Sequence, residues 1–212
     1  MMKRSIFFDL DGTLWDAIDP LVDAYNETMK RHGYDYTFDY AKVKSCMGLT
    51  PEETGSLFFP ELPVQEGIDL FKLIVREEIT YLAKHPGKLY PHEREVLAEL
   101  KKKYDLYVVS NADVGYIENY LDSHDMHEYF KGHLCAGDTG MAKWQNIVYL
   151  RDKEKIDDVI YVGDTNKDKI ETQRAKAKFI HAAYGFGTID PDPYKIDSLD
   201  ELPALAEKLF NM

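Results

Sequence analysis

The stretch RSIFFDLDG, residues 4–12, combines an apolar run with two aspartates that stand one residue apart. The run stops at Gly12, so it predicts a buried strand whose carboxyl end leads into a loop. Core packing gives no reason for Asp9 and Asp11 to lie so close, because their like charges repel each other. We therefore expect both carboxylates to have a chemical role at the end of this strand.

Later in the chain, strand patterns alternate with helix patterns. Strands are predicted at 105–112, 157–165 and 179–185, and helices at 92–104, 114–124, 144–154 and 167–177. This alternation is typical of a parallel sheet with helices on both faces. The sequence therefore predicts an α/β protein with a Rossmann-like parallel-sheet core, whose functional crevice lies beyond the carboxyl ends of the strands.

The segment between the first strand and this alternating region has only helical patterns. Apolar residues recur there at helical spacing, which predicts helices at 20–33, 39–48, 51–59 and 66–85. Pro20 suits the start of the first of these helices, and Gly33 suits its end. We expect a core domain of residues 1–15 and 88–212, with a small all-helical cap domain, residues 16–87, inserted after the first strand.

Composition narrows the class of protein. The chain has 212 residues, and 44% of them are apolar, which favours a packed core. The formal net charge of −12 argues against nucleic-acid or anionic-membrane partners. We see no signal-peptide pattern and no apolar run that could span a bilayer, so we expect a cytoplasmic protein. We expect it to be a monomer or a homodimer. Cys46 and Cys135 stand far apart, so we expect two buried, reduced thiols.

Polar residues lie at the end of each of the main predicted strands. In a parallel sheet these strand ends meet at one edge, so side chains far apart in the sequence can converge. The residues are Asp9 and Asp11 at the end of the first strand, Ser110 and Asn111 at the end of the second, Asp164 at the end of the third with Asp168 one helical turn on, and Lys143 at a predicted helix start. Carboxylates beside an ammonium group and a hydroxyl suit phosphoryl transfer through a covalent aspartyl-phosphate.

Each of these residues has a predicted role in such a reaction. Asp9 would attack phosphorus, and Asp11 would protonate the leaving oxygen and later activate water. Asp9 and Asp164 offer the hard oxygen ligands that Mg²⁺ prefers, so Mg²⁺ is the expected cofactor. Lys143 would balance the remaining negative charge. The residues predicted to bind the substrate are Thr13, Ser110 and Asn111.

These motifs resemble those of the haloacid dehalogenase superfamily, in its phosphoglycolate phosphatase-like branch with a helical cap. DLDGT (9–13), Ser110 in VVSNA, Lys143 and GDTNKD (163–168) match the four motifs of the family in order. The resemblance implies Mg²⁺ bound by the Asp9 carboxylate, the Asp11 backbone carbonyl and Asp164, with Asp168 as a supporting group. It also implies a small phosphorylated metabolite, phosphoglycolate-like or a sugar phosphate, as the substrate.

Three alternative functions stay open at this point. A β-phosphoglucomutase-like phosphotransferase typically has a Thr and a His in the linker to its cap, where this chain has Ala17 and Leu21. A phospho-signalling receiver has about half this length and no helical insertion. A catalytically silent binding protein would have lost at least one motif residue, whereas all of them are present here.

Substrate selection is expected to come from the cap, because the phosphate site serves every substrate. The loop MGLT (47–50) could reach into the site, or it could be an ordinary turn capped by Thr50. Trp15 could line the entrance or simply pack. Trp144 stands where many members of the family have a proline-containing motif, and it could alter the rim of the site.

Overall fold

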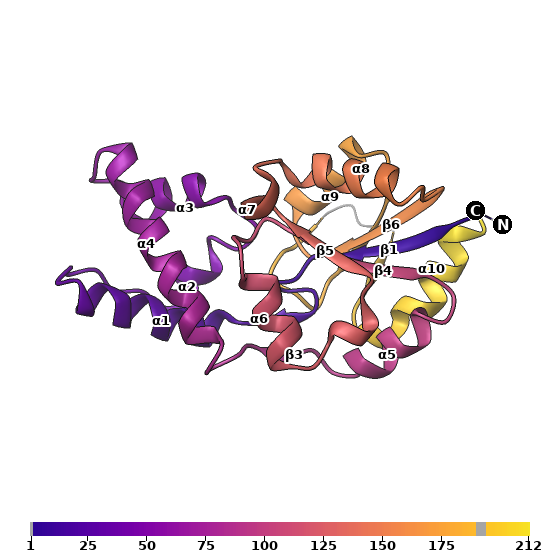
Figure 1. Cartoon of the computed structure of the whole chain (residues 1–212), viewed down its shortest axis with the longest axis horizontal. Coiled ribbons are helices and arrows are strands. Elements are labelled where there is room, and N and C mark those ends of the chain that lie inside the picture. Colours follow the sequence, from indigo (N-terminus) through magenta and orange to yellow (C-terminus); the bar gives the residue numbers. More distant parts are fainter. Residues whose placement is uncertain (1, 190–193) are drawn as a thin grey trace.

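A six-stranded parallel sheet forms the centre of the structure (Figure 1), a computed structural model that describes residues 2–189 and 194–212. The strand order across the sheet is β5-β4-β1-β6-β7-β8. The strands are β1 (Arg4–Phe8), β4 (Asp105–Ser110), β5 (Gly132–Cys135), β6 (Asp158–Gly163), β7 (Lys178–Ala182) and β8 (Lys195–Ile196). The chain builds the sheet outward from β1 in both directions, so the strand order reverses between β1 and β6.

Helices cover both faces of this sheet. Successive side chains of a strand point to opposite faces, so each strand contributes to the core on both sides. Phe7, Tyr107 and Tyr161 share one face, where they pack with residues of α8. Ile6 and Phe8 belong to the larger core cluster on the other face, with residues of α5, α6 and α10. The flanking elements are α5 (Glu93–Leu100), α6 (Tyr116–Ser123), a 3-10 turn (His127–Tyr129), α7 (Ala136–Thr139), α8 (Lys143–Lys153), α9 (Asn166–Arg174), a 3-10 turn (Leu199–Glu201) and α10 (Leu202–Phe210).

Four helices fill the segment between two short strands, β2 (Trp15–Asp16) and β3 (Lys88–Leu89), which pair antiparallel. Figure 1 shows these helices together at one end of the molecule, far from both termini. Their aromatic side chains pack edge to face, with the ring centroids of Tyr25 and Phe71 6.1 Å apart. The four helices are α1 (Ile18–Arg31), α2 (Tyr40–Lys44), α3 (Pro51–Phe58) and α4 (Val64–Leu82).

The predicted α/β class with a parallel Rossmann-like sheet is confirmed. Several details differ from the sequence-based expectation, and β2, β3, α7, β8 and α10 were not predicted. Helix α1 begins at Ile18 rather than at Pro20, and the Asp16 carboxylate accepts a hydrogen bond from the Ile18 N–H at 3.0 Å. Strand β5 was not predicted, because its four residues, GHLC, are only partly buried up to Cys135 and give no continuous apolar run.

Two further expectations can be compared with the described residues. Cys46 and Cys135 are both buried and form no disulfide, as predicted. Among the helices in the described part of the chain, none has the length and apolar character needed to cross a membrane.

Candidate active site

The loops that follow β1, β4 and β6 meet at the carboxyl edge of the sheet, next to the point where the strand order reverses. Phe8, the last residue of β1, lies in register with Val108 on one side and Val162 on the other. Asp9, Ser110 and Asp164 therefore come together although they are far apart in the sequence, and all three are buried. The topology thus produces the convergence that the sequence predicted.

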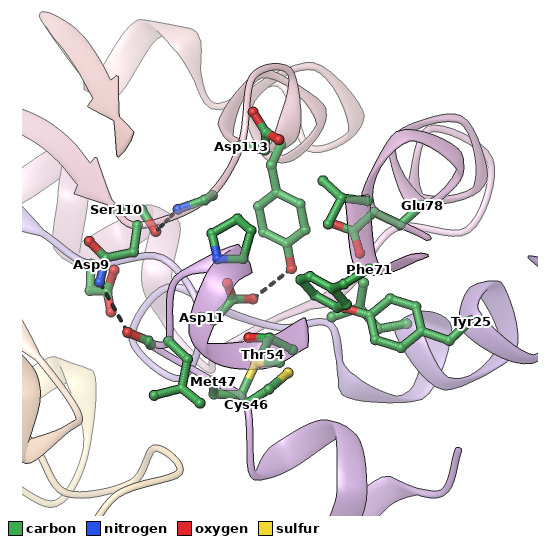
Figure 2. Close-up of a pocket in the computed structure, with 18 residues that line it drawn as sticks. Asp9, Asp11, Tyr25, Cys46, Met47, Thr54, Phe71, Glu78, Ser110 and Asp113 are labelled. Carbon is green, nitrogen blue, oxygen red and sulfur yellow. Dashed lines mark hydrogen bonds between the residues drawn. The ribbon is translucent and has the colours of Figure 1, made fainter. Parts of the chain in front are cut away.

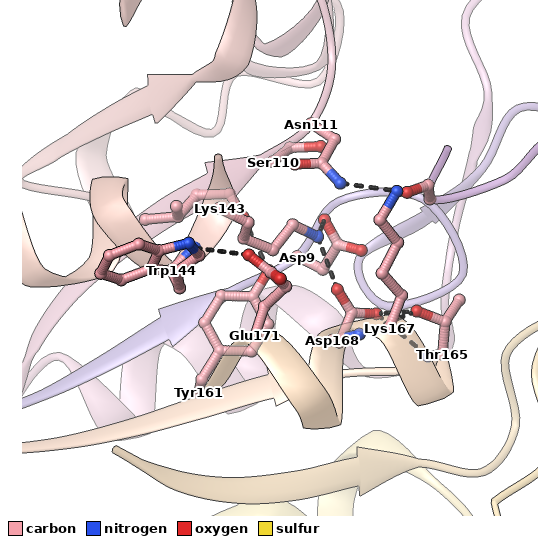
Figure 3. Close-up of polar contacts among 12 residues, drawn as sticks. Asp9, Ser110, Asn111, Lys143, Trp144, Tyr161, Thr165, Lys167, Asp168 and Glu171 are labelled. Carbon is pink, nitrogen blue, oxygen red and sulfur yellow. Dashed lines mark hydrogen bonds and ion pairs between the residues drawn. The ribbon is translucent and has the colours of Figure 1, made fainter. Parts of the chain in front are cut away.

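Lys143 is the first residue of α8, and its side chain points into this cluster (Figure 3). Its Nζ lies 2.9 Å from Asp9 Oδ1 and 2.6 Å from Asp168 Oδ1. The other carboxylate oxygen of Asp168 accepts hydrogen bonds from the hydroxyl and the backbone N–H of Thr165, at 2.6 and 3.0 Å. Asp168 is therefore held by α9 and fixes the ammonium group beside Asp9.

Burial and neighbouring charges shift the pKa values of this ion cluster. Burial, and next the charge of Asp168, raise the pKa of Asp9 to about 6, while Lys143 acts in the opposite direction. Burial disfavours the charged form of Lys143, but Asp168 and Asp9 outweigh that effect and hold its pKa well above the ordinary value. The ammonium group therefore stays protonated at neutral pH and can balance a negative group bound beside it.

Asp164 has one carboxylate oxygen held and one oxygen free. Its Oδ2 accepts a hydrogen bond from the Phe186 N–H at 2.8 Å, while its Oδ1 is buried with no hydrogen-bond partner in the described part of the chain. One carboxylate oxygen from each of Asp9, Asp164 and Asp168 lies within 4.8 Å of the other two. Burial, and next Asp168 and Asp9, raise the pKa of Asp164.

This donor set fits Mg²⁺. The cation prefers oxygen ligands and needs one or two carboxylates, with its remaining positions filled by other oxygens. The cluster contains more carboxylates than ammonium groups, and the unpartnered Asp164 Oδ1 is the buried acceptor that a cation would satisfy. Asp168 fits the supporting role better, because Lys143 and Thr165 already occupy both of its oxygens.

Asp11 is positioned by a backbone turn and two hydrogen bonds. Gly12 has φ +74°, a left-handed conformation that side chains disfavour, and it lets the chain turn directly after Asp11. Asp11 Oδ1 accepts hydrogen bonds from Trp15 Nε1 at 3.0 Å and from the Tyr116 hydroxyl at 2.9 Å. Burial, and next the charge of Asp9, raise the pKa of Asp11 to about 7. A carboxyl group of this kind can donate and recover a proton near neutral pH.

The three predicted substrate-binding residues have different surroundings. Ser110 lies at the cavity, and its Oγ accepts a hydrogen bond from the Ala112 N–H at 3.3 Å. Asn111 Nδ2 donates to the carbonyl oxygen of Gly48 at 3.0 Å. Thr13 is completely buried and lies outside the cavity lining, so its binding role stays a prediction.

A cavity of about 80 Å³ lies between the sheet edge and the four helices (Figure 2). Figure 2 shows Asp9 and Ser110 on one side of Asp11, and Tyr25 and Glu78 on the other. The loop between α2 and α3 completes the lining with Met47, Gly48 and Leu49. That loop therefore reaches the site, and Thr50 also caps α3, so both interpretations of MGLT describe the molecule.

Three residues make contacts at the site that the sequence did not predict. Trp15 is fully buried and contacts Asp11 through its indole N–H instead of lining the entrance, and Tyr116 reaches Asp11 from α6. Glu78 reaches the cavity from α4. Trp144, by contrast, packs against the sheet face covered by α8 and is not part of the rim of this cavity.

Comparison with known proteins identifies the family. A family model described as haloacid dehalogenase-like hydrolase matches residues 6–182. The chain belongs to this family. The match covers β1, the four helices of the insertion and the sheet as far as β7, and it confirms the predicted superfamily.

Several relatives of this haloacid dehalogenase-like protein carry phosphatase names. A phosphoglycolate phosphatase from Vibrio parahaemolyticus is 27% identical, with 94% of this chain and 94% of that protein covered. A phosphorylated carbohydrates phosphatase from Thermotoga maritima is 25% identical, with 86% of this chain and 84% of that protein covered. These names agree with the predicted enzyme class, a phosphoric monoester hydrolase.

Solved structures show the same fold. A haloacid dehalogenase-like family protein from Streptococcus pneumoniae has a TM-score of 0.78 at 22% identity, with 96% of this chain and 97% of that chain covered. CbbY from Rhodobacter sphaeroides, in complex with phosphate, has a TM-score of 0.78 at 19% identity, with 95% of this chain and 96% of that chain covered.

Proposed function

We propose that this haloacid dehalogenase-like protein is a Mg²⁺-dependent phosphatase that hydrolyses a small phosphomonoester through an aspartyl-phosphate on Asp9. One observation carries the proposal: a nucleophile, a proton donor and a fixed cation share one buried site. Asp9 lies 2.9 Å from the ammonium group of Lys143, and Asp11, with a pKa raised to about 7, lines the same cavity.

In the first half-reaction, a carboxylate oxygen of Asp9 forms a bond to phosphorus while the bond from phosphorus to the leaving oxygen breaks. Asp11 gives its proton to the leaving oxygen, which departs as an alcohol. Lys143 balances the negative charge that gathers at the site. The Ser110 hydroxyl and the backbone N–H groups that follow it bind oxygens of the phosphate group.

In the second half-reaction, water attacks phosphorus and Asp11 accepts the proton of that water. The bond between phosphorus and Asp9 breaks, so inorganic phosphate leaves and the Asp9 carboxylate is restored. The indole N–H of Trp15 and the hydroxyl of Tyr116 hold the Asp11 carboxyl group in place, which supports the same group acting first as acid and then as base.

Mg²⁺ would be held by the carboxylates of Asp9 and Asp164 and by the backbone carbonyl of Asp11. When bound, it would offset the repulsion between the Asp9 carboxylate and the anionic phosphate group. The unpartnered, buried Asp164 Oδ1 supports this assignment.

Helices α1–α4 would serve as the cap of this site, as expected for a cap domain of residues 16–87 on a core of residues 1–15 and 88–212. They supply the side of the cavity that a leaving group would contact. By covering Asp9 they would also exclude water during the first half-reaction.

A small phosphomonoester is the substrate class that the relatives support, because the names phosphoglycolate phosphatase and phosphorylated carbohydrates phosphatase both describe such compounds. CbbY, which shares the fold, was solved in complex with phosphate, and this agrees with a function in phosphate chemistry.

The experiment is release of inorganic phosphate from p-nitrophenyl phosphate, with Mg²⁺ and with EDTA. We expect turnover by the wild type, and a loss of about 1,000-fold or more in Asp9→Asn, which has no nucleophilic carboxylate. EDTA should abolish turnover, and added Mg²⁺ should restore it. Wild-type turnover no higher than that of folded Asp9→Asn would refute the proposal.

A further inference from the structure

One buried carboxyl group faces the cavity without a role in the proposed reaction. Glu78 lies on α4, is only 5% exposed, and lines the cavity on the side of the four helices. Tyr25, on α1, lines the same side of the cavity and lies close to this carboxyl group. Its Oε2 is buried and has no hydrogen-bond partner among the residues that the structure describes. A buried polar atom of this kind is costly unless a ligand satisfies it.

The neighbouring residue on α4 shows how specific this orientation is. Glu77 points away from the cavity, where it pairs with Arg31 and His32 at 2.5 and 2.7 Å. Consecutive helical residues point about 100° apart, so only Glu78 can face the site. The helix therefore places one glutamate in a surface ion pair and the next one in the cavity.

The cavity lining has no basic side chain. Its ionisable carboxyl groups are Asp9, Asp11, Glu78 and Asp113, and no lysine, arginine or histidine lines it in the described part of the chain. Lys143 is engaged by Asp9 and Asp168 at the sheet edge. The helical side of the cavity, from Leu21 and Tyr25 to Phe71 and Val75, is largely apolar, so an anion placed there would be desolvated without a partner.

We propose, building on the phosphatase function above, that the helical side of the cavity selects a leaving alcohol that carries a second hydrogen-bond donor, a hydroxyl or an ammonium group, which Glu78 binds. A leaving group that carries a carboxylate is rejected. Its negative charge would be desolvated in an apolar pocket whose lining offers no basic side chain to compensate it. Phosphoglycolate, the compound in the names of several relatives, belongs to the rejected class.

The test compares three phosphomonoesters with two-carbon leaving groups: 2-hydroxyethyl phosphate, 2-aminoethyl phosphate and carboxymethyl phosphate, which is phosphoglycolate. Phosphate release with Mg²⁺ gives kcat/KM for each. We expect the hydroxyethyl or the aminoethyl ester to exceed phosphoglycolate at least tenfold, and the better of the two identifies the donor. The inference is overturned if phosphoglycolate is hydrolysed as fast as or faster than both other esters, or if neither of those two esters is hydrolysed.

Variants assign the selection to Glu78. Glu78→Leu should lose most of the preference, because leucine neither accepts nor donates a hydrogen bond. Glu78→Gln should keep a preference for the hydroxyethyl ester, since an amide can bind a hydroxyl, and lose any preference for the aminoethyl ester. A folded Glu78→Leu protein with the wild-type ratio would also overturn the inference.

The matched control is Glu93→Gln on α5. Glu93 is also a buried glutamate beside a tyrosine, and it accepts a hydrogen bond from Tyr120, but it lies outside the cavity lining. This variant should keep the wild-type ratio. Asp9-dependent turnover of p-nitrophenyl phosphate separates the two proposals: if it is present while phosphoglycolate is preferred, only the selection by Glu78 fails. If it is absent, the phosphatase function itself fails.

Discussion

The two sides of the cavity are built in different ways. On the sheet side, Asp9, Asp11 and Ser110 follow or end strands, and hydrogen bonds and ion pairs fix them within the core. On the helical side, Tyr25 and Glu78 project from α1 and α4 among apolar neighbours. The positions of the side chains on the sheet side are set by the order of the strands, so we expect substitutions there to impair the proposed chemistry. The helical side depends on which residues face inward, so single substitutions there can change the substrate.

This difference predicts that substitutions on the sheet side act on the chemical step, whereas those on the helical side act on binding. The predictions below test that division, beginning with the largest expected effect.

Asp11→Asn should slow hydrolysis of 2-hydroxyethyl phosphate by about 10²–10⁴-fold, because an alkoxide leaving group needs a proton. The loss should be smaller with p-nitrophenyl phosphate in single-turnover experiments, since that leaving group departs readily as an anion. Rapid-quench measurement of aspartyl-phosphate formation would show both effects. Equal losses for the two substrates would contradict the acid role of Asp11 and the division between the two sides.

Glu93→Gln tests a carboxyl group that belongs to neither side of the cavity. Burial raises the pKa of Glu93 to about 8, from an ordinary value of 4.5. Between these two pH values the folded protein binds more protons than the unfolded chain, so the group lowers stability as pH rises, by at most about 1.4 kcal/mol per pH unit. The variant cannot titrate, so its free energy of unfolding should fall less from pH 5 to pH 8.

Urea unfolding at a series of pH values measures this slope. Glu95→Gln, an exposed position on the same helix, is the matched control and should keep the wild-type slope. Parallel slopes for Glu93→Gln and the wild type would show that Glu93 does not hold a proton in the folded protein.

Tyr25→Phe should have the smallest effect, and it probes the helical side alone. The change removes the hydroxyl beside Glu78, which can hydrogen-bond that carboxyl group when a ligand is bound, but keeps the ring packed against Phe71. One hydrogen bond has a net value of about 0.5–1.5 kcal/mol, so kcat/KM for the preferred ester should fall about two- to tenfold. We expect the change mainly in KM. A fall in kcat with unchanged KM would place Tyr25 in the chemical step.

The positions of the proposed catalytic residues could be predicted from the sequence because strand ends carry them. Continuous apolar runs identified β1, β4 and β6, and a parallel sheet must bring Asp9, Ser110 and Asp164 to one edge. The position of Lys143 at the start of α8 followed from the same pattern.

The helical side could not be predicted in this way. Periodicity identified α4 as amphipathic, but it gave no reason to assign Glu78 to the cavity and Glu77 to the surface, since that depends on how α4 packs against α1 and α3. The hydrogen bonds from Trp15 and Tyr116 to Asp11 were missed for a similar reason. A buried aromatic residue looks the same in sequence whether or not its polar atom reaches a catalytic carboxylate.

The close approach of the loops after β1 and β7 has a consequence for the history of this sequence. A Cβ atom at position 185 would come within 2.2 Å of the Gly12 carbonyl oxygen and 2.5 Å of the Asp164 Cβ. Neither Gly12 nor Gly185 can therefore gain a side chain without moving Asp164. We therefore expect selection to keep glycine at both of these chemically inert positions for steric reasons alone.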